Sequence, residues 1–419
     1  MTMRLDAATL AFETRYQWRK LRARARRVDQ RVVRLVPAGE PREHALFSYV
    51  LDPLLDRAAA RDTSHTHFWE SLCMVETLLE LGCAVDAVSW TNRTLAPQRD
   101  YGVVLDVRTN LERWAPQLGA GTTRVLHCDT AHWSFNNAAE SARLDALEAR
   151  RGVRLRARRQ MPESGSDRVA DVLSYLGNDF TRSTYLANHA NHANHANHAS
   201  SASRPPMVRI PVSVSHTYDW PAGKDFDRAR HTFLWLGSGG LVHKGLDLVL
   251  EAFAELPHCR LFVCGPISRE RDFARCYRRE LYGLPNVKTI GWVDVASERF
   301  RALARCCGAL VYPSSSEGGG ASALTCMHAG LPAVLTHEAS VDLTSETGVL
   351  LREATVEAVR AAVAEMTERP ARELESMSRA AWEWARAHHS REVFAARFRA
   401  FAEDLIAGRY AASPKRTGE

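Results

Sequence analysis

Two glycine-rich loops in the second half of the chain carry the residue types that bind phosphate. The first loop, GSGGLVHKG, covers residues 237–245 and lies between a predicted strand and a predicted helix. Glycines allow an anion to approach backbone N–H groups, and the start of the following helix adds partial positive charge. Lys244 adds a full positive charge. The glycine spacing is neither that of dinucleotide-binding loops nor that of Walker loops, so it predicts an anion site of another kind.

The second loop, PSSSEGGG, covers residues 313–320 and precedes the helical run ASALTCMHAGLP. Its acid, Glu317, can accept hydrogen bonds from sugar hydroxyls, while the amides of the three following glycines can face a phosphate. An alternative for each loop involves no ligand. Lys244 could be a surface lysine at a helix start, and Glu317 could be an acid held by the partial charge of a helix N-terminus.

The sequence around these loops predicts two α/β domains. Short apolar runs alternate with segments of helical periodicity, which is typical of βαβ units and parallel sheets. In the first half we expect strands at residues 45–51, 85–90, 102–105, 124–128 and 172–176. In the second half we expect strands at residues 232–236, 260–264, 287–290, 309–312 and 333–336. Ligands of such doubly wound parallel sheets bind at the carboxyl ends of the strands, where both glycine-rich loops fall.

Length and composition agree with this architecture. The chain has 419 residues, of which 45% are hydrophobic and 25% are charged. These fractions exclude a disordered chain, a collagen-like fibre and a polytopic membrane protein. No apolar stretch approaches ~18 residues, and the nine cysteines include no Cys-x-x-Cys pair. We expect a cytoplasmic protein with domains at residues 43–215 and 216–385, followed at residues 386–419 by a helix that packs back and a tail.

Residues 1–42 read as a basic helical arm. Residues 1–40 hold ten Lys/Arg against four acids, which accounts for the whole net charge of +6. Aromatic residues lie among the arginines, so the arm could rest on the anionic inner face of a membrane, where each basic group contributes about 1 kcal/mol. The alternative is a solvated helix packed on its own protein. Because the rest of the chain is neutral, we expect no nucleic-acid partner.

A low-complexity tract follows the first domain's last predicted strand. Residues 188–199 read NHA four times and continue into SSASRPP. Such a composition cannot bury a core, so we expect a surface loop or tether over residues 188–203. The histidines recur at three-residue steps, no carboxylate or cysteine joins them, and the tract therefore predicts no metal site.

From residue 232 to residue 332 the order of motifs resembles the donor domain of GT-B glycosyltransferases of the family-4 (group 1) type. The stretch holds the first glycine-rich loop, the helix LDLVLEAFAELP, and then LFVCGP, NVKTIGWV and LVYPSSSEGGG…MHAGLPAV. The resemblance implies the GT-B fold, with two Rossmann-like domains facing a cleft. It also implies a nucleoside-diphosphate sugar as donor substrate and no further cofactor.

The resemblance implies roles for individual residues. Lys244 is similar to the lysine that grips the diphosphate, and Glu317 to the first glutamate of the E-x7-E motif, which holds the donor sugar. The implied donor site contains Gly239, Gly240, Lys244, Gly265, Val293, Glu317, Gly318, Gly319, Gly320 and Thr325. Two positions depart from the family pattern. Thr325 replaces the second glutamate, which binds the ribose, and Gly239 replaces an arginine that neutralises phosphate.

In the first half the resemblance is thinner and rests on histidines. The family places a histidine at the end of a central strand, facing the donor, and the stretch VLHCDTAHW offers His127 and His132. We expect the catalytic role for His127 because it ends an apolar strand, whereas a histidine satisfied in the core is the alternative. His132 joins His65 and His67, from the loop SHTH, as an acceptor-side candidate.

Together these features predict a retaining, metal-independent hexosyltransferase. It would move a sugar from a nucleoside-diphosphate sugar to a glycan or a lipid-linked acceptor. No Asp-x-Asp pair accompanies the loops, so we expect cationic side chains to do the work of a metal. The departures at Gly239 and Thr325 motivate an alternative, a GT-B protein that binds a nucleotide sugar or glycan without turnover. A nucleotide-sugar epimerase of the same architecture fits less well, because the motifs match transferases.

Overall fold

The computed structural model describes residues 10–11, 13–14, 16–18, 21, 27–195 and 204–410, and the side chains of all of these except residues 189–195. These residues form two compact units. The N-terminal unit is made of the described residues within Trp18–His132, Pro162–Ser213 and Arg391–Glu419. The C-terminal unit is made of those within Met1–Gln17, Trp133–Met161 and Val214–Ser390.

The N-terminal unit is built on a seven-stranded sheet with the order β1-β3-β2-β4-β5-β6-β7. Its strands are β1 Val32–Leu35, β2 Glu43–Tyr49, β3 Cys83–Ser89, β4 Val103–Asp106, β5 Thr123–Cys128, β6 Val172–Tyr175 and β7 Met207–Arg209. β1 pairs antiparallel with β3, and every other neighbouring pair is parallel. All residues of β3, β4 and β6 are buried, as expected for central strands of a parallel sheet covered on both faces.

The C-terminal unit is built on a six-stranded parallel sheet with the order β10-β9-β8-β11-β12-β13. Its strands are β8 Thr232–Leu236, β9 Arg260–Cys264, β10 Val287–Gly291, β11 Ala309–Tyr312, β12 Ala333–Thr336 and β13 Gly348–Leu351. Numbered along this unit, the order is 3-2-1-4-5-6, that of a doubly wound nucleotide-binding sheet. Its first strand, β8, therefore lies at the centre, between β9 and β11.

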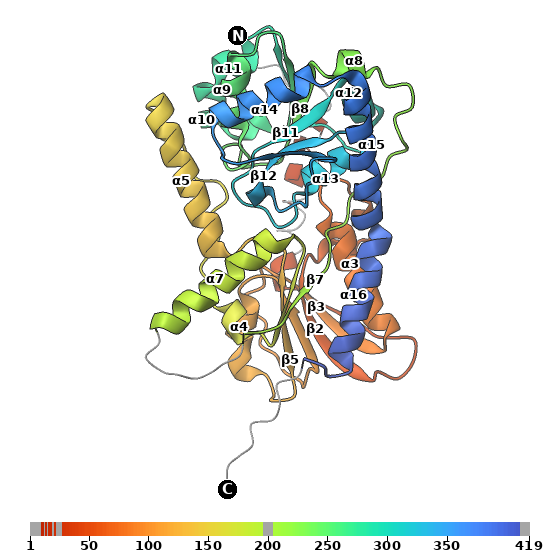
Figure 1. Ribbon diagram of the computed structural model, residues 1–419. Helices are drawn as coiled ribbons and strands as arrows, with labels where there is room; N and C mark the ends of the chain where they lie inside the picture. Colours follow the sequence, from red (N-terminus) through yellow and green to blue (C-terminus); the bar gives the residue numbers. More distant parts are fainter. Residues whose placement is uncertain are drawn as a thin grey trace. The chain divides into compact units, whose positions relative to one another are not determined.

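Helices connect and flank both sheets (Figure 1). Those of the N-terminal unit are η1 Val28–Gln30, α2 Asp52–Leu55, η2 Arg57–Arg61, α3 His67–Glu80, α4 Asn110–Trp114, η3 Ala115–Gln117, α6 Ser166–Val169, α7 Asp179–His195 and α16 Arg391–Ile406. Those of the C-terminal unit are α5 Trp133–Arg151, α8 Phe226–Ala229, α9 Leu246–Ala254, η4 Ile267–Arg269, α10 Arg271–Cys276, α11 Arg278–Tyr282, α12 Glu298–Cys306, α13 Ala321–His328, η5 His337–Ala339, α14 Val356–Glu368 and α15 Ala371–His388.

The predicted α/β fold class and both parallel sheets are confirmed. All ten predicted strands are present, and β8, β9, β11 and β12 have the predicted bounds. The prediction missed β1, β7 and β13, which lie at sheet edges and have only three or four residues. β1 was assigned to the helical arm, and that part of the arm prediction is wrong. Val32–Leu35 instead pairs with β3, where Arg34 lies 3.7 Å from the carboxylate of Asp86.

Two helices depart from a simple division of the chain at residue 216. α16 packs against α3 of the N-terminal unit, where the rings of Phe394 and Trp69 are 5.8 Å apart (Figure 1). α5, drawn in yellow in Figure 1, comes from the first half of the sequence but belongs to the C-terminal unit. Its arginines explain this placement, because Arg150 pairs with Asp247 and Arg151 pairs with Glu280, both of the C-terminal unit.

The low-complexity tract is partly helical. α7 runs without a break from Asp179 to His195, so residues 188–195 are helical where a loop was expected. The alanine at every third position gives the tract enough helix propensity to extend an existing helix. The rest of the tract, residues 196–203, lies outside the described residues, as do 18 of the 42 residues of the predicted basic arm and the tail from residue 411.

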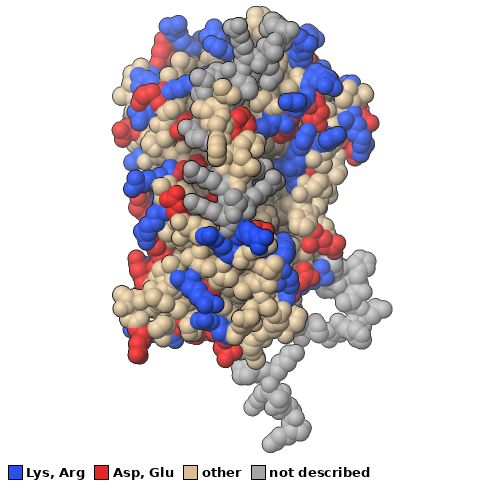
Figure 2. Space-filling model, turned by 180° about the vertical axis from the view of Figure 1, so that it is seen from behind, with Lys and Arg blue, Asp and Glu red and all other residues tan. Residues whose placement is uncertain are grey.

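Acidic and basic side chains are mixed on the face that Figure 2 draws, and none of the described helices suits a membrane span. Within the described ranges, no helix combines the length and the apolar character needed to cross a bilayer.

Gly245 is a position where the fold requires glycine. Its φ is +72°, and an added Cβ would lie 2.3 Å from the carbonyl oxygen of Pro313. We expect Gly245→Ala to lower the free energy of unfolding by about 3 kcal/mol or more, since overpacking adds to left-handed strain. The matched control is Gly223→Ala, where φ is +71° but nothing lies within 4 Å. Its cost should be only about 1 to 2 kcal/mol. Urea unfolding of both variants measures the difference. Equal losses of unfolding free energy would show that the backbone of Pro313 leaves room for a side chain at position 245.

Candidate active site

The two glycine-rich loops lie together at the point where the strand order of the C-terminal sheet reverses. The chain leaves β8 toward β9 on one side, whereas β11 lies on the other side. In open α/β sheets a crevice forms at such a point, at the carboxyl ends of the two strands. Residues 237–245 follow β8 and residues 313–320 follow β11, and the amide of Ser315 donates to the carbonyl oxygen of His243 over 2.8 Å. The fold therefore brings together the two predicted anion-binding loops.

Lys244 and Glu317 form an ion pair at the centre of this site. The Lys244 Nζ lies 2.5 Å from Glu317 Oε1, and their side chains are only 5% and 14% exposed. The same carboxylate oxygen accepts hydrogen bonds from the Tyr312 hydroxyl, at 2.7 Å, and from the Ser314 hydroxyl, at 2.9 Å. The Tyr312 hydroxyl is also 2.8 Å from the lysine Nζ. Tyr312 and Ser314 are site residues that the sequence analysis did not identify.

The electrostatics of the pair follow from burial and from three nearby basic side chains, of which His243 has its own pKa lowered by burial to about 4. Burial by itself would raise the pKa of Glu317, but Lys244, His243 and Arg159 outweigh it and lower that pKa to about 2. Burial lowers the pKa of Lys244, and the charge of Glu317 opposes this shift. Glu317 is therefore ionised at neutral pH, and Lys244 is the cation that compensates it.

The amides that follow Glu317 are available to an anion. Gly318, Gly319 and Gly320 are buried, and within the described part of the chain their N–H groups have no acceptor. They precede α13, whose N-terminus adds partial positive charge in the same place. Gly320 has a φ of +47°, and an added Cβ would lie 2.7 Å from the carbonyl oxygen of Ala339. The conformation that presents these amides thus depends on glycine.

The amides of the first loop are already occupied by a carboxylate. Glu270, which is 6% exposed, accepts hydrogen bonds from the amides of Gly240, at 2.5 Å, and Leu241, at 3.2 Å. Burial raises the pKa of Glu270, and these two hydrogen bonds oppose the shift. The neighbouring Gly239 has room for a side chain, because the nearest atom to an added Cβ is a Glu270 oxygen at 3.7 Å. Sequence gave no signal for Glu270, which follows the strand by six residues.

The remaining predicted donor-site residues have mainly structural contacts. Gly265 lies against the first loop, where an added Cβ would be 2.6 Å from the carbonyl oxygen of Gly237. Val293 follows β10 and is 5% exposed. The Thr325 hydroxyl donates to the carbonyl oxygen of Ala321 one turn earlier in α13, at 2.8 Å. This hydrogen bond engages the hydroxyl that stands in place of the family's second glutamate.

In the N-terminal unit, two of the four predicted histidines lie against Tyr49, and a third lies against one of these two. The Tyr49 ring at the end of β2 lies 5.2 Å from the His67 ring and 5.7 Å from the His127 ring. His65 is 4.0 Å from His67. His127 is fully buried, its Nδ1 is 2.8 Å from the Ser174 hydroxyl, and burial lowers its pKa to about 3. It is therefore a neutral imidazole at physiological pH.

His132 belongs to a different environment. Its ring lies 5.2 Å from the ring of Tyr185, its Nε2 is 3.7 Å from the Asp167 carboxylate, and it is 1% exposed. The structure thus separates His132 from the other acceptor-side candidates. Glu70 lies 4.0 Å from His67, and burial raises its pKa to about 7. The hydrogen bonds that the amide and hydroxyl of Ser213 donate to Glu70 oppose this rise. Sequence analysis missed Glu70, which lies inside α3.

Among the described residues, no group of three or more His, Cys, Asp or Glu side chains is arranged to hold a metal ion.

Comparison with known proteins defines the fold of the chain. In three solved structures the whole of the known chain aligns with 87–88% of this chain. They are sucrose-phosphate synthase from Thermosynechococcus elongatus (13% identity, TM-score 0.57), WaaG, a glycosyltransferase involved in lipopolysaccharide biosynthesis (16%, 0.51), and HepE of Anabaena in complex with UDP and glucose (11%, 0.51). The fold is GT-B. Residues 230–369 match the family model described as glycosyl transferases group 1. This range contains both glycine-rich loops, so the resemblance inferred from the motifs is confirmed.

Other comparisons are more limited. The chain spans only 60% of the length of the pneumococcal O-GlcNAc transferase GtfA, at 14% identity and a TM-score of 0.45. It spans 55% of the length of TarM from S. aureus, at 10% identity and a TM-score of 0.49. No curated protein sequence matches the chain.

The Lys244–Glu317 pair predicts a specific pH dependence of stability. The pKa of Glu317 in the folded state lies below its usual value of 4.5. The contribution of this carboxylate to the free energy of unfolding is therefore complete above pH 4.5 and is lost as the pH falls toward 2. We expect Glu317→Gln to be about 3 kcal/mol less stable than the wild type near pH 7, at about 1.4 kcal/mol per pKa unit. The difference should shrink below pH 4.5.

Urea unfolding from pH 7 to pH 3.5 measures this difference. Glu346→Gln, at an exposed position in the same unit, is the control and should match the wild type at every pH. A Glu317→Gln deficit that stays constant over the whole range would contradict an ionised, charge-compensated Glu317.

Proposed function

We propose that the chain is a glycosyltransferase that moves a sugar from a nucleoside-diphosphate sugar to an acceptor. The observation that carries this proposal is the arrangement at the carboxyl ends of β8 and β11. There, a buried lysine, a carboxylate that is only 14% exposed and three buried glycine amides without an acceptor in the described chain lie on two adjoining loops. Both loops fall within the range that matches group 1 glycosyl transferases.

Each part of this arrangement has a place in the reaction. The amides of Gly318, Gly319 and Gly320 and the N-terminus of α13 bind the distal phosphate, and Lys244 neutralises the diphosphate as it leaves. Glu317 accepts hydrogen bonds from the donor sugar and orients it. In this proposal the diphosphate replaces Glu317 as the partner of Lys244. The positive charge that neutralises the leaving diphosphate then comes from the protein, so the proposed reaction needs no divalent metal.

The finer parts of the proposal rest on the group 1 resemblance. They are retention of anomeric configuration, transfer of a hexose, and an acceptor that is a glycan or lipid-linked. The group of His65, His67 and His127 around Tyr49 is the proposed acceptor-side surface of the N-terminal unit. We further propose that the protein works in the cytoplasm and meets the membrane through its basic arm.

A second candidate is a GT-B protein that binds a nucleotide sugar without turnover. Two observations favour it. No arginine stands at position 239, and the Thr325 hydroxyl is engaged within its own helix. The two candidates differ in one measurement, since most transferases slowly pass the donor sugar to water. A thermal-shift panel of UDP, GDP, ADP and their sugars identifies the ligand, and release of free sugar from the best donor then separates turnover from binding.

Variants of Lys244 and Glu317 test the proposed roles. Lys244→Ala should weaken binding of the nucleoside diphosphate by about 1.5 to 3 kcal/mol, because a charge-assisted contact is lost. Glu317→Ala should leave this binding unchanged or tighter, because Lys244 loses a competing carboxylate, and should lower turnover. Isothermal titration and a turnover assay measure both. The exposed Lys288→Ala is the charge control and should behave as the wild type. Normal binding and turnover in both site variants would refute the assignment.

A further inference from the structure

The proposed diphosphate site lacks one of the two cations that the motif resemblance leads us to expect. Lys244 is present, but position 239 is glycine. A leaving diphosphate carries more negative charge than one lysine can neutralise, and Lys244 already compensates Glu317. A second cation must therefore come from elsewhere in the chain if the site is to hold a diphosphate well.

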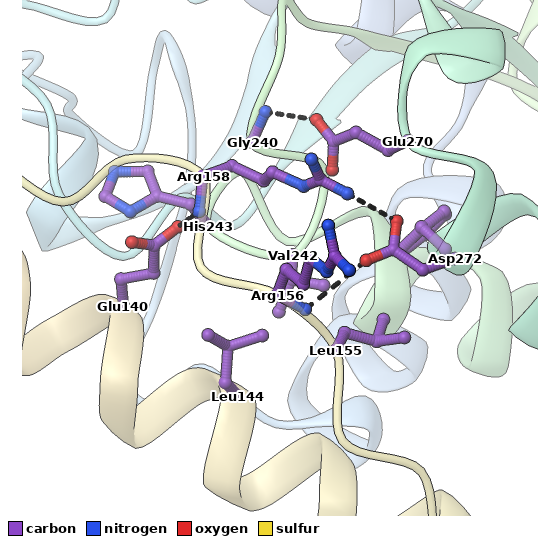
Figure 3. Close-up of a pocket in the computed structure, with 11 residues that line it drawn as sticks. Glu140, Leu144, Leu155, Arg156, Arg158, Gly240, Val242, His243, Glu270 and Asp272 are labelled. Carbon is purple, nitrogen blue, oxygen red and sulfur yellow. Dashed lines mark hydrogen bonds and ion pairs between the residues drawn. The ribbon is translucent and has the colours of Figure 1, made fainter.

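The segment that follows α5 is fixed against the first glycine-rich loop. The Glu140 carboxylate in α5 accepts hydrogen bonds from the amides of Arg158, at 2.7 Å, and Arg159, at 2.8 Å. The Asn136 side chain donates to the carbonyl oxygen of Arg159 over 2.7 Å. A small pocket between this segment and the loop, shown in Figure 3, is bridged by Arg158, which reaches Asp272 at 2.7 Å. The backbone of Arg159 is thus held on both sides.

The side chain of Arg159 lies over Gly240. A Cβ added to Gly240 would be 2.5 Å from the Arg159 Cγ and 2.8 Å from its Cδ, so the aliphatic stem packs directly on the glycine. Within the part of the chain that the structure describes, the guanidinium makes no hydrogen bond or ion pair, and the residue is exposed. By contrast, Arg150 and Arg151 at the end of α5, and Arg158 of the segment after it, are each paired with a carboxylate.

The charge of Arg159 acts on the site itself. It contributes to lowering the pKa of Glu317 and of Lys244. Its effect on both members of the ion pair agrees with its position over the loop that joins β8 to Lys244. Arg159 therefore combines a fixed backbone, a guanidinium with no partner among the described residues, and proximity to the candidate phosphate-binding loops.

We propose that Arg159 supplies the second cation for the donor diphosphate, in place of the arginine that is absent at position 239. This inference rests on the proposed function, because it assigns a residue to the same site. The guanidinium would reach the diphosphate from the segment after α5 rather than from the glycine-rich loop, and its planar fork suits bidentate contact with phosphate oxygens.

The test compares the affinity for a nucleoside diphosphate with that for the matching monophosphate. The probe is whichever of UDP, GDP and ADP binds the wild type best, measured by isothermal titration. Arg159→Ala should lower diphosphate affinity about tenfold and monophosphate affinity about threefold or less. The matched control is Arg156→Ala, which removes an exposed arginine from the same segment that does not lie over Gly240. It should bind within about twofold of the wild type.

A double variant tests whether the charge itself matters. Gly239→Arg in the Arg159→Ala background places an arginine at a position with room for a side chain. It should recover diphosphate affinity to within about threefold of the wild type, with thermal unfolding confirming that both variants fold.

Several results would overturn the inference: no recovery in the double variant, equal losses for di- and monophosphate, or the same loss in Arg156→Ala. Wild-type diphosphate affinity in Arg159→Ala would also overturn it. If Lys244→Ala still lost affinity in that case, the proposed function would stand and only the role of Arg159 would fail. If the wild type bound none of the three diphosphates, the proposed function and this inference would fail together.

Discussion

The buried ion pair between Lys244 and Glu317 joins the two loops that leave β8 and β11. A carboxylate so little exposed stays ionised only when its charge is compensated, and one of its oxygens accepts from Lys244, Tyr312 and Ser314. The pair therefore fixes the second loop relative to the first. Gly245, directly after the lysine, lies so close to Pro313 that no side chain fits. Charge and close backbone packing act at the same point of the sheet.

Two carboxylates neutralise the positive features of this region from within the protein. Glu317 compensates Lys244, and Glu270 occupies the amides of Gly240 and Leu241. An anion that binds the first loop must displace Glu270, whereas the amides after Glu317 have no acceptor in the described chain. This difference makes the amides at the start of α13 more accessible to an anion than those of the first loop. α5 and the segment after it bring further arginines to the same unit, although they come from the first half of the sequence.

The sequence alone was sufficient for the fold class, for ten of the thirteen sheet strands in the described part of the chain and for the two loops. Apolar runs such as TFLWL and RLFVC are typical of buried parallel strands, and the glycine-rich loops that hold Lys244 and Glu317 mark where two strands end. Local periodicity and turn chemistry are enough for such elements. The sequence was insufficient for β1, β7 and β13, because short edge strands pair through contacts with neighbouring strands rather than through a hydrophobic pattern of their own.

Only the tertiary structure decided which side chains share the site. The partners of Glu317 include Tyr312 and Ser314 as well as Lys244, and the partner of the first loop's amides is Glu270, 30 residues beyond Gly240. Lys244 and Glu270 are distant in the sequence from their partners and reach them through the strand order, whereas Tyr312 and Ser314 lie within five residues of Glu317. The same holds for Arg159: residues 150–159 contain six arginines, and the sequence cannot distinguish the five others from the one that lies over Gly240. That distinction arises from the hydrogen bonds that hold this segment against the C-terminal unit.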